Sequence, residues 1–557
     1  MTDLLPATAA IRAEPDGYDM AKVQLMGRQA AGHGFLRAAV EARGDHPVYA
    51  FSHDAGAVQG FRAIVRAIDA AAPVDWIHAE HLARLDRVGV LYLADATVAT
   101  HSRLRQRVGL TGFSLCGVTH TTASHGAMDE IAGLLREPVA PWDALICTSR
   151  SVLETVRRIH EAETDYLRWR FGPEARIEGP QLPLIPLGVH CDDFVFDDAT
   201  RQAGRTALGV ADDEVMALFV GRLVHHAKAH PYAMFRGLQL AAERTGQRMV
   251  LVLSGWFPNP HIEEAFRSGA RAFAPDVRLV IVDGREPATR DHVWAGADIF
   301  VSLSDSIQET FGLTPIEAMA AGLPVVVTDY DGYKDTVRHE IDGFRVRTMA
   351  PGPNSGQALS RAFEVGSLNY DNYCWATTAA TAVDVGQVAD AVAALVCDPA
   401  LRRRMGDAGR ARAREVFDWP VVFRQYQALW AELDAHRRAA AADPALQARL
   451  NALSRAASAR PDPFEAFGHY PTRAITPETR LALAAGVTRA DMDRVLDHSL
   501  FAALTFPRAR AEALFDALDA ASEAPLADLA SSLNANAALT ARIAALLLKT
   551  SLARPVE

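Results

Sequence analysis

The chain has 557 residues, 49% of them hydrophobic and 22% charged, and its net charge is −11 at neutral pH. This length exceeds what one hydrophobic core normally holds, so two or three globular domains are expected, and the composition excludes a disordered or fibrous chain. The acidic balance argues against nucleic acid as a partner and against more than peripheral contact with an anionic membrane.

Short apolar runs alternate with helical stretches in the first third of the chain. Five of these runs are rich in strand-forming residues: VYAFS near 50, DWIHA near 76, VGVLYLA near 90, FSLCGVT near 116 and ALICTS near 146. This alternation is typical of βαβ units around a parallel sheet. It predicts a Rossmann-like domain over residues 1–186, and the proline and glycine of LPLIPLGVHCDDF (182–194) favour a change of domain there.

The same pattern then restarts. Strand-like runs stand at 216–221, 249–255, 277–284, 298–304 and 324–329. They predict a second doubly wound domain over residues 187–416. The chain is helical from about 387, and the helix near 417–438 is expected to return to the first domain.

Residues 461–480 are rich in proline and turn formers, as a linker would be. The rest of the segment 461–557 is helical and alanine-rich, and its short helices with an Asn-Ala-Asn break loosely resemble a winged-helix module. Its last predicted helix offers only Arg542 and Lys549 as cations, too few to hold duplex DNA. We expect a packing or partner-docking extension.

The most informative segment is ETFGLTPIEAMAAGLPVV, which starts at Glu309. Thr314 is a good N-cap, Pro315 suits the first helical position, and Gly322 suits the left-handed position after a helix. These residues predict a short helix over 315–321 that begins at the carboxyl edge of the second sheet.

The N-terminus of that helix would bind an anion through its free N–H groups, and Gly312 would let a diphosphate approach the backbone. We therefore expect Gly312, Leu313 and Thr314 to contact a diphosphate. Glu317 has a competing explanation, because Thr-x-x-Glu is also a capping box in which the glutamate only bonds back to the cap.

The segment FVGRLVHHAKAHP supplies two cations after the first strand of the second domain. Arg222 and Lys228 suit a diphosphate clamp, as one planar fork and one compact charge, although a surface arginine and lysine would look the same. Three nearby histidines lack the cysteine or carboxylate partners that a closed metal site needs, so no metal is expected. They are His225, His226 and His230.

Other strand ends add candidates of a weaker kind. Gly255, Asp283 and Gly284 follow strands that end at the same edge, and are expected to line the nucleotide crevice. Asp329, Asp331 and Asp335 could contact substrate, but turn and cap roles are favoured for them.

In the first domain, a glycine loop is expected ahead of a helix, because Gly27, Gly32 and Gly34 precede a helical run. His120 ends a strand-like run, where open α/β sheets place ligands, and is favoured over His125 as a site residue. Each signal also has a purely structural explanation: glycines are common in turns, and a histidine at a strand end can be a packing or capping residue.

Together these segments resemble family 4 glycosyltransferases, which are retaining enzymes of the GT-B fold, over roughly residues 20–435. The resemblance implies two Rossmann-like domains facing across a cleft, a nucleotide-diphosphate sugar as donor substrate, and no cofactor. It places Glu309 beside the transferred sugar, Glu317 on the ribose, and Arg222 and Lys228 on the diphosphate.

The resemblance also places His120 near the reacting sugar, and the glycine loop before the donor phosphates. Two departures weaken it: the gap between Arg222 and Lys228 is one residue longer than usual, and Leu187 and His190 replace the usual asparagine and aspartate.

The five cysteines are widely spaced with no CxxC pair, and the first twenty residues lack the pattern of a secretory leader. No run reaches the roughly 18 apolar residues of a membrane span. We expect a cytoplasmic glycosyltransferase. Its acceptor could be a carbohydrate, a lipid-linked group or a protein, and the sequence does not indicate its oligomeric state. The alternatives are another GT-B enzyme, such as a phosphorylase or epimerase, and a noncatalytic sugar-nucleotide sensor or scaffold.

Overall fold

The computed structural model describes residues 8–20, 27–455, 458–502 and 506–556. Contacts divide the chain into two compact units, Met1–Ala457 and Ser458–Glu557. Among the residues described, no helix combines the length and apolar character that a membrane crossing needs.

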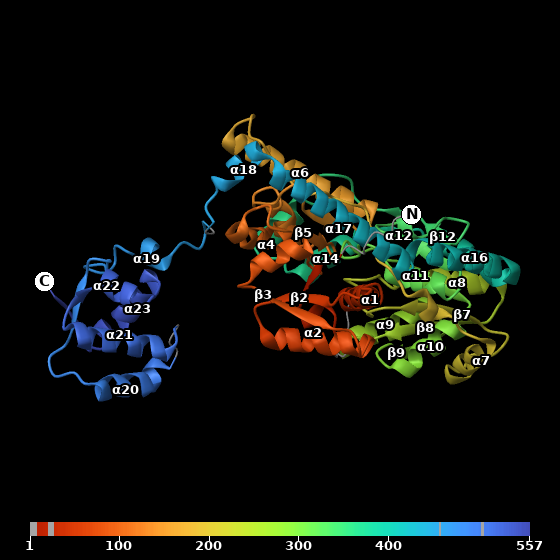
Figure 1. Ribbon diagram of the computed structural model, residues 1–557. Coiled ribbons are helices and arrows are strands. Elements are labelled where there is room, and N and C mark those ends of the chain that lie inside the picture. Colours follow the sequence, from red (N-terminus) through yellow and green to blue (C-terminus); the bar gives the residue numbers. More distant parts are fainter. Residues whose placement is uncertain (1–7, 21–26, 456–457, 503–505, 557) are drawn as a thin grey trace. The chain divides into compact units, whose positions relative to one another are not determined.

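The first unit begins with a parallel six-stranded sheet in the order β3-β2-β1-β4-β5-β6 (Figure 1). Its strands are β1 (Ala10–Arg12), β2 (Val48–Ser52), β3 (Val74–His78), β4 (Val90–Tyr92), β5 (Ser114–Val118) and β6 (Ala144–Ile146). The flanking helices are α1 (Gly27–Glu41), α2 (Ala55–Ile68), α3 (Leu85–Val88), α4 (Val98–Arg105), α5 (His125–Gly133) and α6 (Arg150–Phe171). All five predicted runs form strands here, and β1 is an additional central strand.

A second parallel sheet follows, in the order β12-β11-β10-β7-β8-β9. Its strands are β7 (Val215–Val220), β8 (Met249–Gly255), β9 (Val277–Asp283), β10 (Ile299–Ser302), β11 (Val325–Thr328) and β12 (Gly343–Val346). Its helices include α7 (Asp198–Ala207), α8 (Tyr232–Thr245), α9 (Pro260–Phe273), α10 (Pro287–Gly296), α11 (Leu313–Ala320), α12 (Tyr333–Thr336), α15 (Val385–Cys397) and α16 (Pro399–Arg412).

The two sheets repeat one topology, because each runs outward in both directions from its first strand, β1 or β7. In such sheets the chain order reverses between the first and fourth strands, and ligands bind outside the carboxyl ends at that point. The expected fold class, two Rossmann-like halves with a C-terminal extension, is confirmed.

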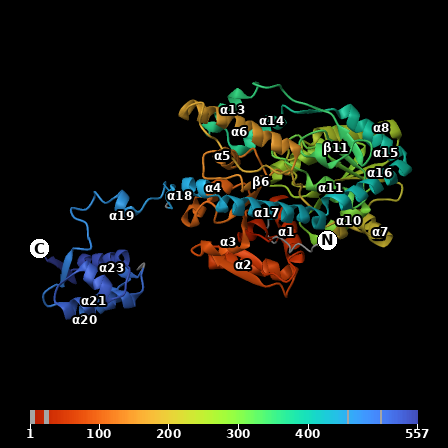
Figure 2. The same ribbon diagram turned by 45° about the horizontal axis from the view of Figure 1, so that its top comes forward.

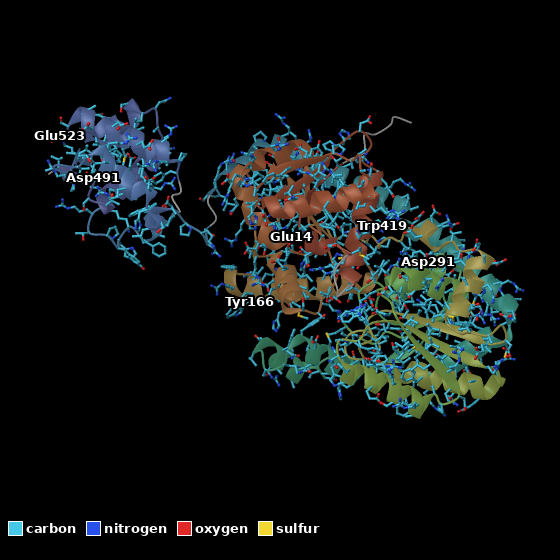
Figure 3. All side chains as sticks on the ribbon, turned by 90° about the horizontal axis from the view of Figure 1, so that it is seen from below. Glu14, Tyr166, Asp291, Trp419, Asp491 and Glu523 are labelled. Atoms are coloured by element: carbon cyan, nitrogen blue, oxygen red, sulfur yellow. The ribbon has the colours of Figure 1, made fainter. Side chains whose placement is uncertain are left out.

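Helix α17 (Trp419–Ala442) carries the chain back from the second half to the first, where it packs on α1 (Figure 2). Trp419, Tyr426 and Trp430 are buried, and all three rings lie close to the ring of Phe35 on α1. Trp419, labelled in Figure 3, also abuts Gly188 in the crossover between the halves. This aromatic cluster holds α17 against α1 and, through Trp419, against the crossover between the halves.

An insertion of two short strands and two helices follows β12 in the second half. Strands β13 (Thr348–Met349) and β14 (Ala382–Val383) pair with each other, and between them run α13 (Gln357–Glu364) and α14 (Tyr370–Thr378). Helix α13 reaches the first half, where His125 Nε2 lies 2.9 Å from the carbonyl oxygen of Phe363.

The second unit has its own core and an antiparallel sheet in the order β16-β15-β17, which the sequence did not predict. Its elements are β15 (Arg480–Leu483), α20 (Arg489–Asp497), α21 (Arg508–Ala521), β16 (Ala524–Pro525), α22 (Leu526–Ser532), α23 (Ala537–Lys549) and β17 (Ala553–Val556). Two short helices lie in the segments that flank the division between the units: α18 (Pro444–Asn451) and α19 (Pro463–Ala466).

Candidate active site

A cavity of about 330 Å³ lies between the two halves of the first unit, at the carboxyl ends of their strands. The first half contributes the start of α1 and the residues after β5. The second half contributes the loops after β7 and β10 and part of α14. The lining residues are Gly27, Arg28, His120, Thr121, Ser124, Leu187, Arg222, Lys228, Gln308, Glu309, Thr310, Phe311, Gly312, Leu313, Thr314 and Tyr370.

Helix α11 begins at Leu313, two residues earlier than predicted, because Gly312 rather than Thr314 is its N-cap. Gly312 has φ +90°, and a Cβ there would lie 2.1 Å from the ring of Tyr333, so only glycine fits. No side chain caps this helix in the part of the chain that the structure describes. Its first N–H groups therefore face the cavity, as an anion site requires.

The capping-box explanation of Glu317 is excluded, because the helix begins before Thr314 and its cap makes no side-chain hydrogen bond. Burial raises the pKa of Glu317, and the nearby positive charge of Arg290 opposes this only in part. Glu317 lies on α11 outside the cavity lining.

Glu309 and Lys228 form an ion pair in the wall of the cavity, with 3.0 Å between Oε2 and Nζ. Burial alone would raise the pKa of Glu309, but the charge and hydrogen bond of Lys228, with the N–H of Thr310, outweigh it and hold the pKa below its ordinary value. Glu309 is therefore ionised at neutral pH. A buried negative charge is normally found only with a positive partner, and Lys228 is that partner here.

Arg222 follows β7 and is held by Gln308. When the amide of Gln308 is oriented to satisfy both of its ends, its oxygen accepts a hydrogen bond from Arg222 Nη2 at 2.9 Å, and its nitrogen donates to the carbonyl of Ala227 at 2.9 Å. Burial lowers the pKa of Arg222, and the negative charge of Glu309 is among the groups that oppose this. The positive charges of Arg222, Arg28 and Lys228 together favour binding of an anion in this cavity.

Two hydrogen bonds join the halves directly behind Glu309. Thr310 Oγ1 donates to the carbonyl oxygen of His120 at 3.2 Å, and Ser149 Oγ donates to the carbonyl oxygen of Thr310 at 2.7 Å. The strand end that bears His120 is thus tied to the loop that bears Glu309.

Burial, followed by the nearby positive charge of Arg28, lowers the pKa of His120 to about 4. The imidazole is neutral at pH 7 and cannot serve as a cationic acid there. Because the folded pKa lies below the unfolded value near 6.5, the folded state binds fewer protons in the window between them, and stability falls as pH falls through it.

This predicts a measurable pH dependence. Between pH 7 and pH 5, the wild-type protein should lose about 2 kcal/mol more unfolding free energy than His120→Gln, as measured by urea denaturation at both values. Equal losses in the two proteins would show that His120 titrates normally.

The predicted glycine loop is wrong at Gly32 and Gly34, while the residues just before Gly27 lie outside the described part of the chain. Gly27 is the first residue of α1, and Gly32 and Gly34 lie inside the helix, buried. A Cβ on Gly32 would lie 2.1 Å from the carbonyl oxygen of Gly17, and one on Gly34 would lie 2.4 Å from Trp419 Nε1. These glycines permit close packing of α1, and neither lines the cavity; only Gly27 does.

The strand-end candidates also stand apart from the cavity. Gly255, Asp283 and Gly284 lie at the carboxyl edge as expected, but none is among the described residues that line it. Gly255 allows the ends of β7 and β8 to approach, since a Cβ there would lie 1.9 Å from the carbonyl oxygen of Gly221. Hydrogen bonds from Arg285 lower the pKa of Asp283.

The structure therefore brings Arg222, Lys228, Glu309 and His120 together from three separate segments. Three further residues that the sequence analysis did not name line the same cavity: Arg28, Gln308 and Tyr370. Arg28 directly follows a predicted site glycine, and Gln308 directly precedes Glu309, so each stood beside a recognised signal. The hydroxyl oxygen of Tyr370 lies 3.5 Å from Oγ1 of Thr121. No local sequence pattern indicates Tyr370 as a site residue.

Part of the chain that includes the second half of this cavity is similar to known proteins. Residues 200–356 match the model of a protein family described as group 1 glycosyl transferases. An uncharacterized glycosyltransferase of Methanocaldococcus jannaschii is 32% identical over 195 residues, covering 33% of this chain and 48% of the relative. A D-inositol 3-phosphate glycosyltransferase of Segniliparus rotundus is 24% identical over 296 residues, covering 50% of this chain and 60% of the relative.

The chain thus spans 48% to 60% of the length of these curated relatives. A solved structure of Anabaena HepE in complex with UDP matches 76% of this chain and 100% of its own, with 14% identity and a TM-score of 0.49. The family match includes Arg222, Lys228 and Glu309 and ends before Tyr370.

Proposed function

We propose that the protein is a retaining glycosyltransferase that moves a sugar from a nucleotide-diphosphate sugar to an acceptor hydroxyl without a metal ion. One observation carries the proposal: Arg222, Lys228, Glu309 and the uncapped start of α11 meet at one cavity between two Rossmann-like halves. The match of residues 200–356 to group 1 glycosyl transferases supports it independently.

The chemistry needs positive charge where the leaving group departs. As the bond between the anomeric carbon and the phosphate oxygen breaks, negative charge grows on the diphosphate, and Arg222, Lys228 and the α11 N–H groups would stabilise it. The diphosphate would compete with Glu309 for Lys228, so its arrival frees the carboxylate to contact the sugar. These protein cations take the part that a divalent ion plays in other transferases.

In the retaining step, the acceptor oxygen bonds to the anomeric carbon on the face that the phosphate leaves. The acceptor's proton passes to the departing phosphate oxygen, so no side chain has to bond covalently to the sugar. Neutral His120 would orient the reacting groups without supplying a proton. Closure of the halves around the cavity would exclude water, which otherwise competes with the acceptor.

Donor binding gives the simplest test. A nucleotide sugar that binds only the folded protein, at a hundred times its dissociation constant, should add about 2.7 kcal/mol of stability. Thermal unfolding with UDP-, GDP- and ADP-sugars should reveal one such donor. Arg222→Ala should lose the stabilisation, while Arg248→Ala, at an exposed surface ion pair with Asp213, should keep it.

If no nucleotide sugar stabilises the wild-type protein, the proposed donor site is wrong. Slow hydrolysis of the stabilising donor without acceptor would further separate an enzyme from a sensor, since a pure sensor should leave the donor intact.

A further inference from the structure

A second cavity, of about 320 Å³, adjoins the first at Glu309, the one residue among those described that lines both. It lies between α5 and α6 of the first half and the segments 307–309 and 330–334 of the second. This volume is at the lower end of the range for small-molecule sites, so it suits a ligand about the size of one sugar ring.

The lining of this second cavity combines hydroxyl groups with apolar surface. Such a mixture fits a molecule with hydroxyls at its edge and C–H groups on its faces. The hydroxyls come from Thr122, Ser151 and Thr155, and apolar walls from Met128, Val152 and Ile307.

Asp331 is the unusual residue of the second cavity. Its φ is +46°, a left-handed conformation that aspartate adopts more readily than most residues but that still costs energy relative to glycine. Its Oδ2 is buried and has no hydrogen-bond partner among the residues that the structure describes. Burial and the negative charge of Glu309 raise the pKa of Asp331 well above its ordinary value.

A strained backbone and an orphaned buried carboxyl oxygen both lower stability, and together at a cavity wall they are typical of a functional site. A ligand hydroxyl would satisfy the Oδ2 of Asp331. The turn and cap role that the sequence favours for Asp331 explains its main-chain bond to Lys334 N–H, but not the unsatisfied side chain.

We propose, building on the glycosyltransferase function above, that this second cavity binds the acceptor, that the acceptor is a compact polyhydroxylated alcohol such as a free sugar or cyclitol, and that Asp331 holds one of its hydroxyls. A ligand here lies against the same Glu309 carboxylate that the transferred sugar contacts. The reacting hydroxyl is therefore delivered from the Asp331 side of Glu309, and the bonds formed and broken are those of the transfer step already given.

The first arm of the test uses the donor that the thermal screen identifies. myo-Inositol and D-glucose serve as polyols, and cyclohexanol serves as an alcohol of similar size without the extra hydroxyls. The proposal predicts transfer to at least one polyol and none to cyclohexanol. Donor hydrolysis without transfer to either polyol would overturn the proposal and leave the donor assignment intact, whereas absence of donor binding would remove both.

The second arm uses Asp331→Gly, which removes the carboxyl and relieves the backbone strain. We expect a higher Tm together with a KM for the polyol raised roughly tenfold to a hundredfold, and a smaller change in KM for the donor. Glu340→Gly is the matched control, because Glu340 is exposed and also left-handed, with φ +63°. It should raise the Tm and leave the KM for the polyol unchanged.

Asp331→Asn provides a second variant of nearly unchanged shape, since asparagine tolerates the left-handed conformation. It should fold normally and still raise the KM for the polyol. A wild-type KM in both Asp331 variants would overturn the proposal, whatever their effect on Tm.

Discussion

Arg222→Ala should slow sugar transfer by about a hundredfold or more, because one well-aimed donor to a developing negative charge contributes about 3 kcal/mol to the transition state. Arg222 is partly buried, is held by Gln308, and lines the same cavity as the start of α11, so water cannot replace it well. Steady-state kcat and kcat/KM with the identified donor would measure the loss.

Arg222→Lys is the informative companion. It keeps the charge but loses the planar fork, so we expect it to recover only part of the rate. Arg248→Ala, at the exposed ion pair, should retain wild-type rates. A rate within threefold of the wild type for Arg222→Ala would contradict the proposed role in leaving-group stabilisation.

Glu309→Gln should lower kcat by roughly a hundredfold while leaving nucleotide affinity unchanged or tighter. The side chain keeps its shape, but the negative charge beside the transferred sugar is lost. Because this charge competes with the diphosphate for Lys228, 3.0 Å away, its removal cannot weaken diphosphate binding through that cation. Binding of the free nucleoside diphosphate, measured by calorimetry beside kcat, separates the two effects.

Glu317→Gln gives the matched comparison for that experiment. Glu317 lies outside the cavity lining, and the family resemblance places it on the ribose, so its loss should appear in nucleotide affinity. If Glu309→Gln turned over at the wild-type rate on the true substrates, Glu309 would have no role in the reaction.

Much of the fold could be predicted because buried parallel strands are continuous apolar runs. Runs such as VYAFS and MVLVLSG have no other stable place than a sheet covered on both faces. β1 and β12 escaped prediction because AIR is three residues long and GFRV contains a glycine and an arginine. Long-range pairing with stronger neighbours, which no local pattern contains, makes them strands.

The candidate site was predictable where one segment carries several signals together, as at Glu309 and α11. The prediction failed where one residue type serves two structural purposes. Gly32 and Gly34 were expected in a loop, but glycine also permits close helix packing, and only the position of Trp419 decides between them. Tyr370 could not be singled out, because its hydroxyl meets Thr121 from 249 residues away in the chain. Asp331 was named among three aspartates, but no local pattern separates it from Asp329 and Asp335.

The most direct test of the account is the position of the pyrophosphate in a crystal structure with the nucleoside diphosphate of the stabilising donor. The account predicts its oxygens within hydrogen-bonding distance of Arg222 and of the N–H groups of Leu313 and Thr314, with Lys228 turned toward them. A pyrophosphate bound away from the start of α11, with the cavity occupied by side chains, would contradict it.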